Sequence, residues 1–159
     1  MDKRVVTGIT SSLKDAKITL VGVRDKPGVA AEIFMSLADS NINVDMIVQN
    51  ISEGGKTTDI TFTVPKDDTD KSEKIMSEIK ESVPYERVII DSKIAKISVV
   101  GVGMRSNAGV ASGMFNVLSD NGININVIST SEIKISVLIN EKEAEKATKM
   151  LHKFFELDR

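Results

Sequence analysis

The segment KITLVGV at residues 17–23 returns as KISVVGV at residues 96–102, with five of the seven residues identical. Both segments are apolar and rich in β-branched residues, which is typical of a buried strand. Each is followed by a short polar loop and then by a second matching pair, Gly28-Val29-Ala30 and Gly109-Val110-Ala111. The chain therefore carries the same strand and the same helix start twice.

The repeat continues through the following helix and beyond it. Its apolar positions match without a gap, with Ile33, Phe34 and Leu37 in the first copy and Met114, Phe115 and Leu118 in the second. The segment DSNINV at residues 39–44 then matches DNGINI at residues 120–125. A repeat of this length predicts two copies of one compact module that contains both helices and strands.

The composition argues against several classes of function. The 159 residues are 41% hydrophobic and 28% charged, with a formal net charge of -2, so the basic excess of a nucleic-acid or anionic-membrane surface is missing. Aromatic residues make up 4%, too few for base-stacking platforms. The chain has no cysteine for a disulfide or a thiolate zinc site, and we expect a reducing cytoplasm. No apolar run approaches the ~18 residues of a membrane span.

The first module reads as β-α-β-β-α-β, the arrangement of ferredoxin-like folds. The expected strands are residues 18–23, 42–50, 60–64 and 87–91, with a hairpin at Gly54-Gly55 and a polar linker at 11–16 before the first strand. The first expected helix starts at Val29, and the second carries Ile75, Met76, Ile79 and Val83 after an acidic loop at 65–70. The fold class is α+β, with two such modules, antiparallel sheets and helices packed on one face of each sheet.

The second module repeats the pattern but is one strand short. Its expected strands are residues 97–102, 123–129 and 133–139, and its helices are residues 110–119 and a last helix capped by Asn140 with Glu143. Residues 5–9 form an extra β-branched run before the first module. We therefore expect one domain at 12–92 and a second at 93–159 that is completed by an N-terminal strand at 3–10.

No credible catalytic, metal or cofactor site emerges from the sequence. Gly101-Val102-Gly103 opens towards a helix, but Ser106 stands where a dinucleotide fingerprint needs its third glycine. His152 is the single histidine, which leaves a Ser-His-Asp set or a histidine metal site poorly supported. The acids of the loop at 65–70 are better explained as a solvated loop than as a metal cluster.

The loop before the first helix is the better candidate for a binding site. The N–H groups at a helix N-terminus suit a carboxylate, and Gly28 allows a ligand to approach the backbone. Asp25 supplies a negative charge for an ammonium group. Together these features describe a receptor for a free amino acid. The alternative is that Asp25-Lys26-Pro27-Gly28 is only a good turn, and these residues alone leave both interpretations open.

A resemblance to a known family bears on this choice. The segments that carry it are residues 6–9, 25–30 (DKPGVA), 42–50, 57–62 and 127–133. A β-α-β-β-α-β module with DKPGVA before its first helix resembles an ACT domain, and the tandem pair resembles the C-terminal regulatory region of aspartate kinase. The resemblance implies feedback control of the first step of the pathway to lysine, threonine and methionine, through bound lysine, threonine or both. Apart from this effector we expect no cofactor, and we expect no catalytic site in this chain.

The resemblance also implies partners and site residues. In the family, effectors lie between the first module of one chain and the second module of another, so we expect a homodimer and a kinase catalytic domain or alpha subunit as partner. In the family the kinase domain would precede Met1. This chain is therefore expected to be either a separate regulatory subunit or a part of a longer chain that includes the kinase domain. The implied effector-binding residues are Asp25, Gly28, Val29, Ala30 and Gln49 from the first module and Asn124, Ile125, Thr130, Ser131 and Glu132 from the second.

The second loop departs from the family pattern at two positions, which argues against a second effector site built on it. Ala108 replaces the proline that the family often has, and no acid matches Asp25. For the effector, Gln49 offers a donor and an acceptor to a hydroxyl group, which favours threonine, whereas Glu132 suits a lysine ammonium.

The alternative function is a freestanding ACT-type amino-acid sensor or adaptor without a kinase partner. A small ferredoxin-like enzyme is less well supported, because no acid–base or nucleophile set is present.

Overall fold

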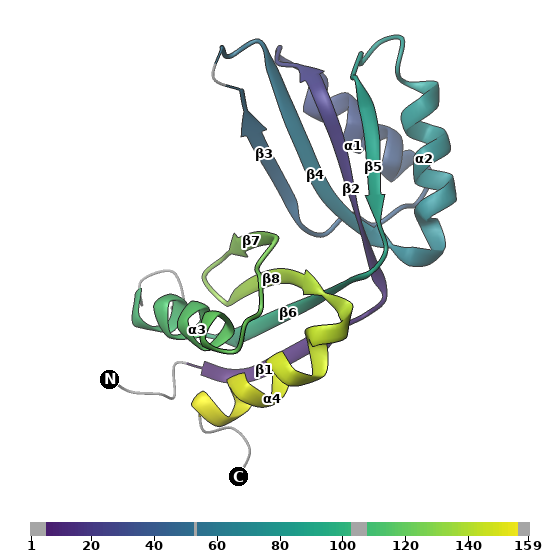
Figure 1. Cartoon of the computed structure of the whole chain (residues 1–159). Helices are drawn as coiled ribbons and strands as arrows, with labels where there is room; N and C mark the ends of the chain where they lie inside the picture. The colour runs from purple at the N-terminus through teal and green to yellow at the C-terminus, as the bar shows by residue number, and fades with distance from the viewer. Residues whose placement is uncertain (1–5, 53, 103–107, 156–159) are drawn as a thin grey trace. The chain divides into compact units, whose positions relative to one another are not determined.

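The computed structural model describes residues 6–52, 54–102 and 108–155, and the chain divides into two compact units (Figure 1). One unit is residues 14–92. The other combines residues 1–13 with residues 93–159. Each unit holds one four-stranded antiparallel sheet.

The unit at 14–92 has the α+β order that the first module predicts. Its elements are β2 (Asp15–Arg24), α1 (Val29–Asp39), β3 (Ile47–Ile51), β4 (Thr57–Pro65), a 3₁₀ turn (Lys66–Asp68), α2 (Thr69–Glu78) and β5 (Arg87–Asp91). The strand order in the sheet is β3-β4-β2-β5. This is the ferredoxin-like topology, with the first strand of the module in the interior and the last at an edge.

The second unit has the same topology built from both ends of the chain. Its elements are β6 (Ile94–Gly101), α3 (Ala108–Asp120), β7 (Val127–Thr130), β8 (Lys134–Asn140), a 3₁₀ turn (Glu141–Glu143) and α4 (Ala144–Phe154), together with β1 (Val6–Ser12). The strand order is β1-β6-β8-β7, with Ile9 opposite Val99 and Thr10 opposite Ser98. β1 therefore takes the edge position that β5 takes in the other sheet (Figure 1).

Helices cover one face of each sheet and enclose a core there. In the unit at 14–92, Ile33 and Leu37 of α1 and Met76 of α2 pack with alternate residues of β2 and β4. Phe62 is fully buried and meets Phe34 edge to face, with ring centroids 5.4 Å apart. The alternation in β4 follows from the pleat, which sends successive side chains to opposite faces of the sheet.

Two polar contacts recur at equivalent places in the two units. Lys71 of α2 donates from Nζ to the carbonyl of Ser40, at the C-terminus of α1. Lys146 of α4 donates in the same way to the carbonyl of Asn121 at the end of α3, at 2.9 Å. A cation at a helix C-terminus satisfies an orphan carbonyl and is favoured by the helix dipole. In each unit a lysine of the second helix therefore holds the C-terminus of the first helix by a hydrogen bond.

The second recurring contact is a hydroxyl pair in the middle of each sheet. Thr19 and Thr61 face each other across β2 and β4, with their oxygens 2.9 Å apart. Ser98 and Ser136 do the same across β6 and β8 at 2.7 Å. Cross-strand hydroxyl pairs of this kind stabilise a sheet.

Several predicted boundaries are wrong, and two of them for the same reason. The strands expected at 42–50 and 123–129 begin only at Ile47 and Val127. The start of each segment instead closes the preceding helix, because the amide of Ile42 donates to Leu37 and that of Ile123 donates to Leu118. These residues are apolar and β-branched, yet their backbone is held by the helix end rather than by a strand ladder.

The other corrections concern polar segments. The expected linker at 11–16 is mostly strand, with Ser11 opposite Ile97 and Ala16 opposite Val64, since ladder hydrogen bonds use only the backbone. The expected loop at 65–70 is a 3₁₀ turn and the start of α2, where acids near a helix N-terminus are favourable. α2 ends at Glu78, before Ile79 and Val83. Further on, the Asn140 side chain accepts from the amide of Lys142 at 2.9 Å, so its capping partner is not Glu143.

One buried hydroxyl gives a test of the core. Among the described residues, Ser72 Oγ on α2 is a buried side-chain atom without a hydrogen-bond partner. The equivalent position in α4 is Ala147, which is also fully buried. We expect Ser72→Ala to raise the free energy of unfolding of this unit by about 1 kcal/mol, because an unsatisfied buried polar group is removed. Chemical denaturation monitored by circular dichroism measures it.

The matched control is Ser77→Ala, at an exposed position of the same helix. This variant gains only the higher helix propensity of alanine, because the position is not buried. We expect it to raise the free energy of unfolding by roughly 0.5 kcal/mol or less. A destabilised Ser72→Ala variant, or equal gains at both positions, would show that the Ser72 hydroxyl is satisfied in solution.

Candidate functional site

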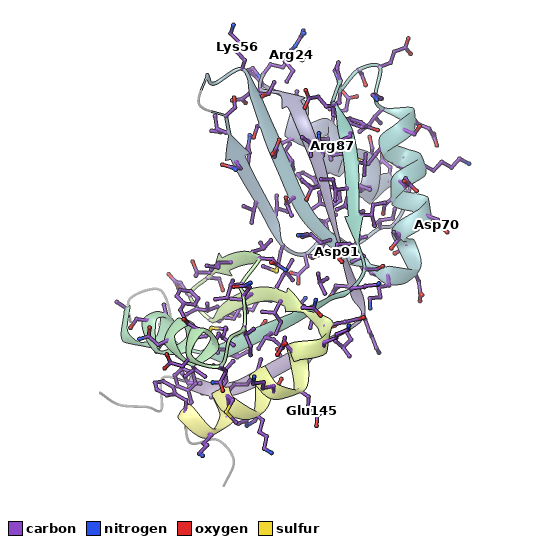
Figure 2. The ribbon with its side chains drawn as sticks, viewed as in Figure 1. Arg24, Lys56, Asp70, Arg87, Asp91 and Glu145 are labelled. Atoms are coloured by element: carbon purple, nitrogen blue, oxygen red, sulfur yellow. The ribbon has the colours of Figure 1, made fainter. Side chains whose placement is uncertain are left out.

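The loop that joins β2 to α1 is tied to the neighbouring hairpin. The amide of Asp25 donates to the carbonyl of Lys56 at 3.0 Å, which fixes the loop against the turn between β3 and β4. Figure 2 shows Arg24 and Lys56 together at this end of the unit. This hydrogen bond fixes the position of the loop beside the sheet.

Gly28 begins α1 in a conformation that other residues rarely adopt. Its φ is 89° and it occupies the N-cap position, where serine, threonine or aspartate would otherwise supply a capping oxygen. A Cβ added at Gly28 would meet nothing within 4 Å, so the space beside it is open. The amides of Ala30 and Ala31 belong to the first turn, which cannot pair within the helix. They are thus left available to an external acceptor.

A hollow of about 420 Å³ lies beside this helix start. It is lined by Arg24, Asp25, Lys26, Pro27, Gly28, Val29, Ala30, Ala31, Gln49, Thr58 and Ile60. Its floor is apolar and buried at Val29 and Ile60. Thr58 in the lining is also buried, and its hydroxyl donates to the carbonyl of Asn50 at 3.2 Å. Its rim is exposed and polar at Asp25 and Gln49. A hollow with an apolar floor and a few polar groups at its rim is typical of small-molecule sites.

The structure brings together all five residues named in the first module. Asp25, Gly28, Val29, Ala30 and Gln49 line the same hollow, although Gln49 comes from β3. Gln49 sits opposite Ile60 across the β3–β4 ladder, on the face that α1 covers. Among the lining residues Asp25 is the one acid, beside the cations Arg24 and Lys26. Amide donors, an acid and an amide side chain together match a zwitterion with a small polar side chain.

The five residues named in the second unit do not converge. Asn124 and Ile125 line a separate hollow of about 460 Å³ between α3 and the start of β7. Thr130 is the last residue of β7, and Ser131 and Glu132 follow in the turn to β8. Residues 126–129 lie between Ile125 and Thr130, which corresponds to roughly 16 Å of extended chain.

Ser131 organises the β7–β8 turn. Its amide donates to the carbonyl of Lys134 at 2.8 Å. Its hydroxyl oxygen accepts from the amides of Ile133 and Lys134, at 3.4 Å and 3.2 Å. The structure thus assigns Ser131 a local role in closing the hairpin.

The other sites weighed in the sequence are a dinucleotide motif, an acidic loop, a metal site and a membrane span. Gly103 and Ser106, of the rejected dinucleotide motif, lie outside the described residues, as does the loop at 103–107 that matches the first binding loop. Asp67 and Asp68 lie in the 3₁₀ turn before α2. Within the described residues no group of three histidines, cysteines or acids is placed to hold a metal ion. None of the helices described is both long and apolar enough to span a bilayer.

Sequence reasoning missed the floor of the hollow and its cations. The sequence shows Ile60 as an alternating residue of the strand expected at 60–64, and Thr58 only as part of the segment 57–62 that carries the resemblance. Their position beside the loop depends on the register of β4 against β2 and β3. Arg24 is the last residue of β2 and Lys26 lies in the loop that follows, in a segment that the sequence indicates as a polar turn. Their charge near Asp25 was the available signal.

Comparison with known proteins gives one family and a consistent set of relatives. The ACT domain family matches residues 18–78 and 97–155. Aspartate kinase of Pseudomonas fluorescens is 50% identical over 158 residues, which are 99% of this chain and 38% of that protein. Aspartokinase of Helicobacter pylori is 47% identical over 161 residues, again with 38% of its length covered. The chain therefore spans 38% of the length of these relatives.

Two solved structures match this chain over nearly their whole length. One, described as aspartokinase alpha and beta subunits, has a TM-score of 0.87 and 50% identity, with 95% of this chain and 99% of that chain covered. Another, the ligand-free regulatory subunit of aspartate kinase from Thermus thermophilus, has a TM-score of 0.88 and 38% identity, with the same coverage.

The turn role of Ser131 can be tested separately from ligand binding. We expect Ser131→Ala to weaken the β7–β8 hairpin by about 0.5–1.5 kcal/mol, the value of a side-chain hydrogen bond. Amide hydrogen exchange at Ile133 and Lys134 should then be faster without any ligand present. Glu132→Gln, in the same turn, is the control and should leave exchange unchanged. Unchanged exchange in Ser131→Ala would contradict the turn role.

Proposed function

The chain belongs to the ACT domain family and, within it, to the regulatory regions of aspartate kinases; on this premise we propose that it binds a free amino acid and controls an aspartate kinase by feedback. The observation that carries the proposal is the hollow beside Gly28. It combines amides of a helix start, one carboxylate and one amide side chain around an apolar floor. These groups complement the carboxylate, the ammonium and the side chain of an amino acid.

We propose threonine as the effector of this hollow. Its methyl group would contact Ile60, and its hydroxyl would exchange hydrogen bonds with Gln49, which can donate and accept. Lysine would bring a second positive charge close to Arg24 and Lys26, with Asp25 as the one acid in reach. Lysine binding is better served where Glu132 contributes, in a site that includes the second unit.

We further propose that a second copy of the chain completes the site. Gln49 lies on the edge strand β3 between Ile47 and Ile51, whose side chains are 51% and 60% exposed. Alternate residues of a strand share a face, so an exposed apolar strip borders the hollow. A homodimer in which the first module faces the partner's second module would cover this strip and add Asn124, Ile125, Thr130, Ser131 and Glu132 from the other chain.

The domain boundaries and the kinase partner are proposed on the same premise. We propose ACT domains at 12–92 and at 93–159, the latter completed by residues 3–10, acting on a kinase catalytic domain or alpha subunit. The compact units at 14–92 and at 1–13 with 93–159 support that division. A cytoplasmic location fits a cysteine-free chain and an enzyme of amino-acid synthesis.

Calorimetry with each of the twenty amino acids tests the binding proposal. We expect threonine to bind, and Asp25→Ala to weaken its binding about tenfold to hundredfold. That corresponds to the ~1.5–3 kcal/mol of a hydrogen bond to a charged group. Asp70→Ala is the matched control, because Asp70 is an exposed acid on α2 that does not line the hollow (Figure 2). Equal affinity in Asp25→Ala and the wild type would mean that Asp25 is only a turn residue.

The dimer proposal is tested on the edge strand. We expect Ile47→Lys to shift the chain towards monomer, because an ammonium group would replace apolar surface at the interface. Ile89→Lys is the matched control on β5, the opposite edge of the sheet, where Ile89 is 44% exposed. Sedimentation velocity with threonine present measures both variants. A shift of the same size in both, or a monomeric wild type at high micromolar concentration, would argue against this interface.

A further inference from the structure

Four lysines form a row along one face of α4 and of the 3₁₀ turn before it. We call Lys142, Lys146, Lys149 and Lys153 the lysine row. Their spacing of four, three and four residues places the side chains on one helical face, and all four residues are exposed. At the helical rise per residue the row is about 16 Å long.

The other unit shows the same face without such a row. Counted from the end of the preceding strand, the equivalent residues are Asp67, Lys71, Lys74 and Glu78. There an acid stands four residues from a lysine at each end, which stabilises a helix, whereas neighbouring lysines repel one another and destabilise it. In the second unit Glu145 forms one such pair with Lys149, but both ends of the row are lysines, so the row has four cations where the other unit has two cations and two acids.

The fold itself uses only one of the four lysines. Lys146 donates to the carbonyl of Asn121, as Lys71 donates to Ser40 in the other unit. Lys142 and Lys153 stand where the other unit has acids, so the topology shared by the two units does not require them to be basic. Lys153 lies in the last turn of α4, where the helix dipole favours a cation, whereas the shared topology gives no reason for a cation at Lys142.

A hollow of about 430 Å³ lies within the row. It is lined by Lys142, Glu145, Lys146, Lys149 and Met150. Figure 2 shows Glu145 projecting outward from α4. Met150 is partly buried and supplies an apolar, adaptable surface. The face thus offers several cations, one acid and a small apolar contact.

We propose that the lysine row docks an acidic segment of a protein partner. Carboxylates at helical spacing, or along a short extended strand, would match three or four of the lysines. Glu145 favours a protein over nucleic acid, because a phosphodiester chain is negative at every step, whereas a protein can place a donor opposite that carboxylate. The formal net charge of -2 also gives no general attraction for nucleic acid. This inference does not depend on the amino-acid site, because none of the four lysines is among the residues proposed to bind the effector.

A labelled peptide tests the docking. The probe is a helical peptide of about four turns with glutamates spaced by four, three and four residues, followed by fluorescence anisotropy at low salt. The test variant is Lys142→Asp with Lys153→Glu, which restores the acids that the other unit carries at these positions. We expect it to weaken peptide binding about tenfold or more, as for loss of complementary charges at an interface. Its threonine binding should equal that of the wild type, which controls for folding.

The matched control is Lys74→Glu with Arg87→Glu, which changes the net charge by the same amount on the other unit and leaves the lysine row intact. We expect less than about a twofold change in its peptide affinity. Equal weakening in both variants would reduce the effect to overall charge and overturn the proposal. Tighter binding of an oligothymidylate of matched charge would overturn it in favour of nucleic acid, and no peptide binding at millimolar concentration would overturn it as well.

Discussion

The antiparallel ladder between β1 and β6 is the pairing on which the chain's organisation depends. Without β1, β6 would be an edge strand with unpaired backbone groups, although Ile97 and Val99 on it are fully buried. The ladder brings the N-terminal segment beside residues from the second half of the chain. Residues 14–92 therefore form a unit whose two ends both lead to the other unit. Two equal modules result from one insertion rather than from two successive domains.

The type and order of the elements could be predicted because they depend on local patterns. Alternation in β4 and the helical face of α1 are visible in the sequence, and the α+β fold with ferredoxin-like modules is confirmed. Boundaries depend on where backbone hydrogen bonds go, which side-chain patterns do not show. Ile42 and Ile123 are apolar and β-branched, yet their amides close the preceding helices. Ser11 and Ser12 are polar, yet they pair in a ladder.

The same distinction holds at the candidate site. Asp25, Gly28, Val29 and Ala30 are neighbours in sequence, so their convergence on one hollow needed only a turn before a helix. Gln49 joins them through a strand register, and it was named from a family resemblance rather than from its chemistry. Thr58 and Ile60, which line the hollow from β4, depend on the same register, and the sequence does not assign them to the site. The second-unit residues separate along β7 within one chain, a separation that depends on where β7 begins and ends.

The repeat separates what the fold needs from what it leaves free. Positions that hold a unit together are kept in both copies, such as the lysine that fastens the first helix and the hydroxyl pair across the central strands. Positions that face outward differ in charge, as at Asp67 and Lys142 or at Glu78 and Lys153. Such differences mark positions that the shared fold leaves free to vary. The two units of this chain are therefore built alike but carry different charges on their outward faces.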